Sequence, residues 1–157
     1  MSTYFISDLH LGHRKILEYS PARGGKTIDE HDEWLVSQWN SVVRNKKDLV
    51  WVLGDVCFDI EKMPMLDRMV GRKKLVRGNH DLFNTQVYLK YFEDIYGLYK
   101  KYHMWLSHAP VHPDSLRGRK NIHGHTHSEL PGGEHYRRVC VEVCDAKPIR
   151  LEALRGE

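Results

Sequence analysis

The sequence has few cysteines and no long apolar segment. Its three cysteines form no framework pattern, and Cys140 and Cys144 would be about 13 Å apart on one strand, too far for a bridge, so we expect reduced thiols. No apolar run approaches the roughly 18 residues that span a bilayer. The N-terminus carries neither the basic nor the apolar region of a signal peptide. We therefore expect a cytoplasmic protein with no membrane partner.

The sequence also lacks a strong excess of either charge. The 24 Lys and Arg residues against 21 Asp and Glu residues leave a net charge of +3, which is weak evidence for any partner. Basic residues occur in scattered groups such as 72–74, which are typical of solvated surfaces unless the fold gathers them. There is no internal repeat, no linker and no glycine-rich phosphate cradle. We predict a single domain over residues 1–157 and leave its oligomeric state open.

Histidine, by contrast, is abundant. It accounts for 11 of the 157 residues, although it is not among the common residues of soluble proteins. Imidazole groups serve as metal ligands and as proton carriers near neutral pH. The composition therefore directs attention to where the histidines lie.

The first half of the chain alternates apolar strand-like runs with helical patterns. The pattern predicts buried strands at residues 3–6, 48–53 and 73–76. It predicts helices between them at residues 27–43 and 61–69, and we expect the tryptophans of the longer helix in the core. This alternation predicts a parallel sheet with right-handed crossovers. In the second half, residues 95–99, 103–107 and 136–143 read as strands, and residues 148–154 as a strand or short helix. We expect a second, mostly antiparallel sheet packed on the first.

Polar side chains follow the apolar runs where each predicted strand ends. On extended backbone, residues two apart share a face, so Asp8 and His10 would point the same way, as would His125 and His127. Taken singly, each of these residues could equally be an ordinary surface residue or part of a polar turn or helix cap. Together they form one set at the strand ends: Asp8, His10, Asp55, Asn79, His80, His108, His125 and His127.

This set offers oxygen and nitrogen ligands without a thiolate. Such a mixture is more typical of a site for manganese, iron, zinc or nickel than of a structural zinc finger. Eight ligand-type residues are too many for one tetrahedral ion but suit two ions that share a bridging carboxylate. We therefore predict two divalent metal ions as cofactors, with manganese expected and iron, zinc or nickel as alternatives.

The motifs, in chain order, resemble those of the calcineurin-like metallophosphoesterases, in particular the small phage and bacterial type. They are Asp8-x-His10, Gly54-Asp55, Gly78-Asn79-His80-Asp81, Ser107-His108-Ala-Pro and Gly124-His125-x-His127. The resemblance implies a four-layer α/β/β/α sandwich of two mixed central sheets. It also implies one ion held by Asp8, His10 and His127, a second held by Asn79, His108 and His125, and Asp55 as the bridge.

The resemblance implies a dinuclear-metal-dependent phosphoesterase in which a metal-bridged hydroxide attacks phosphorus in line. The chain has no room for a cap domain, which favours a phosphodiesterase, and its substrate could be a cyclic nucleotide, a nucleotide or a nucleic-acid end. A phosphomonoesterase or nucleotide pyrophosphatase is the alternative enzyme. A non-catalytic metal-binding scaffold is the alternative of a different class.

His80 is the one imidazole of the set that is not needed as a ligand. We assign it, as the resemblance also does, to stabilising or protonating the departing oxygen, with Asp81 orienting its ring. A helix cap is the competing interpretation of Asp81. We also expect the loop at residues 20–25 to lie close to the site. Arg14, Lys15, Arg77 and residues 117–120 are either phosphate contacts or surface charges.

Overall fold

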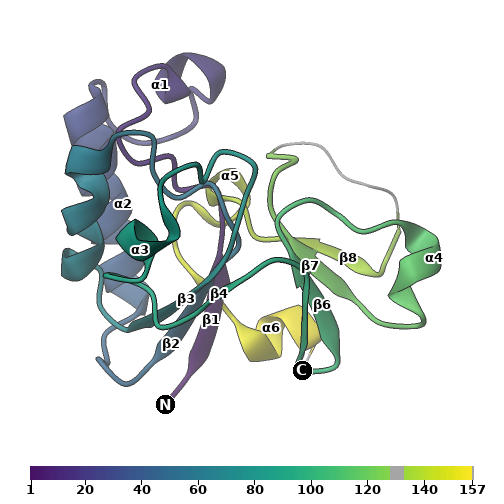
Figure 1. Cartoon of the computed structure of the whole chain (residues 1–157). Coiled ribbons are helices and arrows are strands. Elements are labelled where there is room, and N and C mark those ends of the chain that lie inside the picture. Colours follow the sequence, from purple (N-terminus) through teal and green to yellow (C-terminus); the bar gives the residue numbers. More distant parts are fainter. Residues whose placement is uncertain (128–132, 157) are drawn as a thin grey trace.

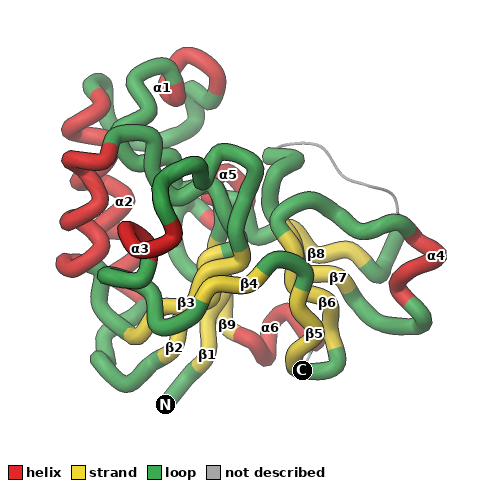
Figure 2. The backbone as a smooth tube through the Cα atoms, viewed as in Figure 1, coloured by secondary structure: helices red, strands yellow, loops and turns green. Residues whose placement is uncertain are grey.

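Two sheets form the centre of the molecule (Figures 1 and 2). The structure is a computed structural model that describes residues 1–127 and 133–156. Within those residues, one sheet has the strand order β4-β3-β2-β1-β9 and the other β5-β6-β7-β8. The strands are β1 (Thr3–Ile6), β2 (Leu49–Val52), β3 (Arg72–Val76), β4 (Ile95–Tyr96), β5 (Tyr99–Lys101), β6 (Met104–Ser107), β7 (Asn121–His123), β8 (Tyr136–Arg138) and β9 (Ile149–Arg150).

Both sheets are mixed. Strands β1 to β4 pair in parallel, as the alternation of strands and helices predicts, and β9 adds to β1 in the antiparallel direction. The prediction of a mostly antiparallel second sheet is wrong, because only β5 and β6 pair that way. Strands β6, β7 and β8 pair in parallel, so each of them begins at the same end of the sheet.

Helices cover the outer face of the first sheet (Figure 1). Helix α2 (Ile28–Val42) begins where the Thr27 side chain accepts the Glu30 N–H, and its residues Leu35 and Trp39 are buried against the sheet, as predicted. The 3₁₀ helix η1 (Ile60–Arg68) and helix α3 (Thr85–Tyr88) lie on the same side. Their apolar side chains join those of α2 in one core cluster.

A second core lies between the two sheets. Phe5, Trp51 and Val76 of the first sheet pack with Leu106 and Ile122 of the second, and all five are almost fully buried. Burying a side chain of this size contributes about 1.5–3 kcal/mol, so this core holds the two sheets together.

The outer face of the second sheet carries only a short helix among the described residues. The Trp105 indole on that face donates a hydrogen bond to the Leu116 carbonyl of α4 (Pro113–Leu116). With this thin outer layer, the fold is the predicted four-layer α/β/β/α sandwich. The remaining helices are α1 (Ile16–Tyr19), α5 (Val141–Cys144) and α6 (Leu151–Arg155). None of the helices described is both long and apolar enough to cross a bilayer.

The C-terminal segment departs from its predicted secondary structure. Strand β8 stops at Arg138, and the continuation expected as strand turns into helix α5. Cys140 and Cys144 therefore lie one helical turn apart instead of along one strand, and both thiols, like that of Cys57, are free. The stretch at 148–154 holds both β9 and α6.

Candidate metal centre

The carboxyl ends of five strands converge at one end of the two sheets. The first sheet brings residues from the loops after β1, β2 and β3, and the second brings residues from the loops after β6 and β7. Ligands collect at this position in open α/β sheets. The structure thus brings together the side chains predicted from the strand ends: Asp8, His10, Asp55, Asn79, His80, His108, His125 and His127.

The local backbone of these residues is not extended, contrary to our prediction. Asp8, His10, Asp55, His125 and His127 all have a positive φ, between 47° and 67°. Strand β1 ends at Ile6 and strand β7 at His123, so neither pair of predicted ligands is held in a strand. Left-handed backbone costs a non-glycine residue about 1–3 kcal/mol, and its concentration here is typical of a functional site.

Glycines allow the loops to approach one another closely. A Cβ atom on Gly54 would lie 2.5 Å from His108 Nδ1, and one on Gly78 would lie 2.5 Å from Asp55 Oδ1. A Cβ on Gly124 would collide with Ser7 Oγ and Asp8 Oδ2. The motif glycines are therefore needed for space around the carboxylates.

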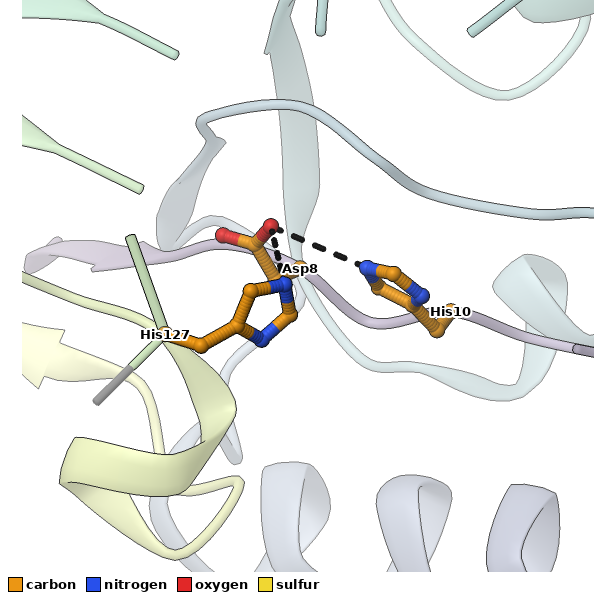
Figure 3. Close-up of side chains that lie close together, drawn as sticks. All are labelled: Asp8, His10 and His127. Carbon is orange, nitrogen blue, oxygen red and sulfur yellow. Dashed lines mark ion pairs between the residues drawn. The ribbon is translucent and has the colours of Figure 1, made fainter. Parts of the chain in front are cut away.

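Asp8, His10 and His127 form the first cluster (Figure 3). Asp8 Oδ1 lies 3.7 Å from His10 Nε2 and 3.5 Å from His127 Nε2, and both rings point toward this carboxylate. Asp8 is fully buried, yet its Oδ1 and the Nε2 of His10 have no hydrogen-bond partner among the described residues. Buried polar atoms are normally paired, so this arrangement fits a cation held between the three side chains.

Asp55, His108 and His125 form the second cluster, together with Asn79. His108 Nε2 lies 3.3 Å from Asp55 Oδ2 and 2.8 Å from Asn79 Oδ1. His125 Nδ1 lies 3.2 Å from the same Asn79 oxygen. The Nδ1 of His108 is 2.7 Å from the Leu53 carbonyl, which leaves Nε2 as the ligand atom. This donor set also fits a divalent cation.

Asp55 lies between the two clusters. Its Oδ2 atom is 3.3 Å from His108 Nε2 and 3.8 Å from His10 Nε2, so one carboxylate oxygen faces an imidazole of each cluster. Its Oδ1 atom accepts the backbone N–H of His80 at 2.9 Å. This is the position that a bridging carboxylate requires.

The charges of the site favour ionised carboxylates. Burial opposes ionisation of Asp8, but the neighbouring His10 imidazole, the nearby charge of His108 and a hydrogen bond from the Ser7 hydroxyl outweigh it and hold its pKa well below the ordinary value. Burial likewise opposes protonation of His108, but Asp55 and Asp8 outweigh that effect and raise its pKa to about 9. The two buried carboxylates therefore favour positive charge at the site, on an imidazole or on a bound cation.

Glu142 and Arg23 support the first cluster, and the sequence analysis missed both. Glu142 Oε1 lies 3.0 Å from His127 Nδ1, which leaves Nε2 for the cluster. The same oxygen accepts hydrogen bonds from Ser20 and Arg23. Arg23, only 4% exposed, also donates to the carbonyls of Asp8 and Leu9 and so fixes the left-handed loop. The loop at 20–25 does lie beside the site, as expected.

Asp81 makes contacts that we did not predict. Its carboxylate accepts the backbone N–H groups of Asp55, Val56 and Gly78 at 2.7–2.9 Å, and the His80 ring is not among its hydrogen-bond partners. Asp81 therefore ties the loop after β2 to the loop after β3. It positions Asp55 and His80 through the backbone, without the predicted contact to the imidazole.

Two clefts open at the clusters, one beside each cluster. The larger, which we call the α1 cleft, has a volume of about 840 Å³ and is lined by His10, His13, Ile16, Tyr19, Ser20, Pro21, Ala22, Phe58, His80, His127 and Glu142. The smaller, the β4 cleft, has a volume of about 460 Å³ and is lined by Arg77, Asn79, Gly97, Leu98, Ser107, His108, Ala109, Val111 and His125. His80 is exposed and lies in the α1 cleft, beside the first cluster.

Comparison with known proteins identifies relatives over almost the whole chain. An uncharacterized protein of Methanocaldococcus jannaschii is 32% identical over 96% of this chain and 88% of its own length. The gene 66 protein of Mycobacterium phage L5 is 31% identical over 90% of this chain and 85% of its own length. The chain belongs to the family of these two proteins. No protein-family model matches it.

A solved structure extends this family resemblance to the fold. A protein of unknown function from Aquifex aeolicus superposes with a TM-score of 0.76 and 26% identity, over 99% of this chain and 98% of its own. The four-layer arrangement therefore recurs in a protein of similar length. The function of the family must be argued from the site.

Proposed function

We propose that this protein is a calcineurin-like metallophosphoesterase that hydrolyses phosphodiesters. The observation that carries the proposal is the pair of ligand clusters with Asp55 between them and His80 beside them. The order of the five motifs in the sequence supports the same assignment. Two bound cations would supply an acidified water and neutralise charge on the phosphoryl oxygens.

The chain's own residues perform the remaining tasks. One cation would be held by Asp8, His10 and His127. The other would be held by Asn79, His108 and His125, and Asp55 would contact both. The P–O bond that breaks leaves an alkoxide oxygen, which takes a proton from the exposed His80 ring. Glu142 keeps Nε2 of His127 directed at the first cluster, and Asp81 keeps Asp55 and His80 on fixed loops.

The two clefts favour a diester over a monoester. A phosphodiester carries two organic groups on phosphorus, and the α1 and β4 clefts provide space beside the first and the second cluster respectively. A phosphomonoester carries one organic group and therefore needs only one cleft. The clefts thus support the preference for a diester, and the comparison of diester with monoester tests it.

The test is hydrolysis of bis-p-nitrophenyl phosphate beside p-nitrophenyl phosphate, by metal-stripped protein refilled with manganese. We expect diester turnover that depends on manganese. For methyl phenyl phosphate, whose leaving oxygen is far more basic than p-nitrophenolate and gains from protonation, turnover should fall about a hundredfold in His80→Ala. The bound metal should stay unchanged in this variant, because His80 is outside both ligand clusters. His112→Ala is the matched control, since this exposed histidine lines neither cleft.

Each outcome bears on a different part of the proposal. Faster hydrolysis of the monoester would keep the reaction class but reverse the substrate preference. Unchanged turnover in His80→Ala would remove His80 from the mechanism. Bound manganese without turnover of either ester would favour the alternative of a metal-binding scaffold.

A further inference from the structure

The α1 cleft is mostly apolar away from the metal clusters. His10, His127 and Glu142 line it at the first cluster, and the rest of the lining comes from α1, the loop that follows it, Phe58 and the imidazoles of His13 and His80. Glu142 and Ser20 already hydrogen-bond to each other. No lysine or arginine is among the described residues that line the cleft. It is therefore poorly suited to a second phosphate and well suited to an uncharged group.

Flat aromatic surfaces gather in this cleft. Phe58 stacks on His13 with ring centroids 4.2 Å apart and planes 11° apart, and it lies 5.1 Å from the His80 ring. Tyr19 is 68% exposed, with its ring centroid 6.0 Å from that of His13. An exposed tyrosine at a cleft offers a face on which another ring can stack.

His80 determines which part of a substrate enters this cleft. The residue that protonates the departing oxygen must lie within hydrogen-bond reach of it, so the leaving group is on the same side of phosphorus as His80. His80 lines the α1 cleft and is not among the residues that line the β4 cleft. The leaving group and the aromatic surfaces therefore share one cleft.

We infer that the α1 cleft binds the leaving group of the phosphodiester, that this group carries a flat aromatic ring, and that Tyr19 stacks on it. The inference rests on the proposed function for the side on which the bond breaks. A volume of about 840 Å³ is within the common range for small-molecule sites and can take a ring system with an attached alcohol. Tyr19 is accordingly a specificity-determining residue.

The test compares two diesters whose leaving alcohols are similarly acidic but differ in ring area: methyl phenyl phosphate and methyl 2-naphthyl phosphate. With the manganese-loaded protein, we expect kcat/KM to be at least about fivefold higher for the naphthyl ester, in line with the stacking of one ring. Tyr19→Ala should abolish this preference, and Tyr19→Phe should retain it. Leu89→Ala, an exposed truncation that lines neither cleft, should leave the preference unchanged.

Binding is measured separately from turnover. Fluorescence anisotropy of methyl 2-naphthylphosphonate, which is not hydrolysed, should show binding by the manganese-loaded protein that weakens at least about fivefold in Tyr19→Ala. Equal kcat/KM for the two esters together with unchanged binding in Tyr19→Ala would overturn the inference while leaving the phosphodiesterase proposal intact. Loss of all turnover with Tyr19-dependent binding retained would overturn the proposed function and leave the aromatic site.

Discussion

Glu142 shows how a residue outside the predicted ligand set controls a ligand. Its carboxylate faces Nδ1 of His127 and is itself held by Arg23. Carboxylates in this position fix the orientation and tautomer of a metal-binding histidine, and their loss typically weakens metal binding about 10- to 100-fold. The geometry of the first cluster therefore depends on a side chain that contacts no other predicted ligand.

Glu142→Gln should weaken manganese binding at one of the two sites by about 10- to 100-fold, because the amide is a poorer partner for the imidazole. Calorimetric titration of the metal-stripped protein with manganese measures the affinity of each site. Glu152→Gln, an exposed substitution on α6, is the matched control. Equal affinities in the two variants would contradict the role given to Glu142.

The same carboxylate should make folding sensitive to acid. Burial opposes ionisation of Glu142, but His127 and Arg23 outweigh it and lower its pKa to about 2, from 4.5. A lowered folded-state pKa stabilises the protein above the unfolded-state value, by roughly 2–3 kcal/mol, and this is lost as the pH falls from about 4.5 toward 2. Urea unfolding of wild type and Glu142→Gln, both metal-stripped, should give stabilities that differ most at pH 7 and converge in acid.

At the scale of the elements, much of the architecture can be predicted from sequence. Strand β1 coincides with the predicted run, and α2 begins and ends within one residue of its predicted bounds, because periodicity and the Thr27 cap are local signals. The proximity of the predicted ligands follows from the convergence of strand ends in a parallel sheet. Their left-handed backbone could not be predicted, because it depends on contacts with neighbouring loops.

The residues that support the site could not be predicted from the sequence for a related reason. Arg23 and Glu142 are 119 positions apart in the chain, and only the finished fold joins them. Asp81 belongs to one of the motifs, but its three partners are amides of two different loops, which the sequence does not show to be neighbours. Sequence identifies the types of side chain that can bind metal, whereas their supports are set by tertiary structure.

The loops after β2 and β3 give a prediction at this scale. Gly78→Ala should place a Cβ 2.5 Å from Asp55 Oδ1 and displace the carboxylate, lowering stability by about 1–3 kcal/mol and weakening manganese binding. Gly97→Ala, where nothing lies within 4 Å of the added carbon, should change neither property appreciably. Urea unfolding and metal titration of both variants test this, and an undisturbed Gly78→Ala would contradict the packing argument.

At the scale of the whole molecule, each cluster draws on both sheets. The first joins the loop after β1 to the loop after β7, and the second joins the loop after β2 to the loops after β6 and β7. A bound ion therefore cross-links the sheets, in addition to the apolar core between them. Stability and metal binding should be coupled.

Manganese should raise the midpoint of thermal unfolding in a concentration-dependent way, because it binds the folded chain and not the separated ligands. At a free concentration 100 times Kd, a single site contributes about 2.7 kcal/mol. His108→Ala should lose most of this gain, and His112→Ala should keep it. A melting temperature that does not respond to manganese in the wild type would contradict metal binding by the folded protein.

The first cluster also constrains when the proposed metal ion could be bound during synthesis. Its ligands run from Asp8, near the start of the chain, to His127, and Glu142 follows later still. During synthesis on the ribosome, the early ligands emerge long before their partners. An ion could be held by all three side chains only after translation has passed His127 and both sheets have come together, so metal loading of this cluster would have to follow folding of the two sheets.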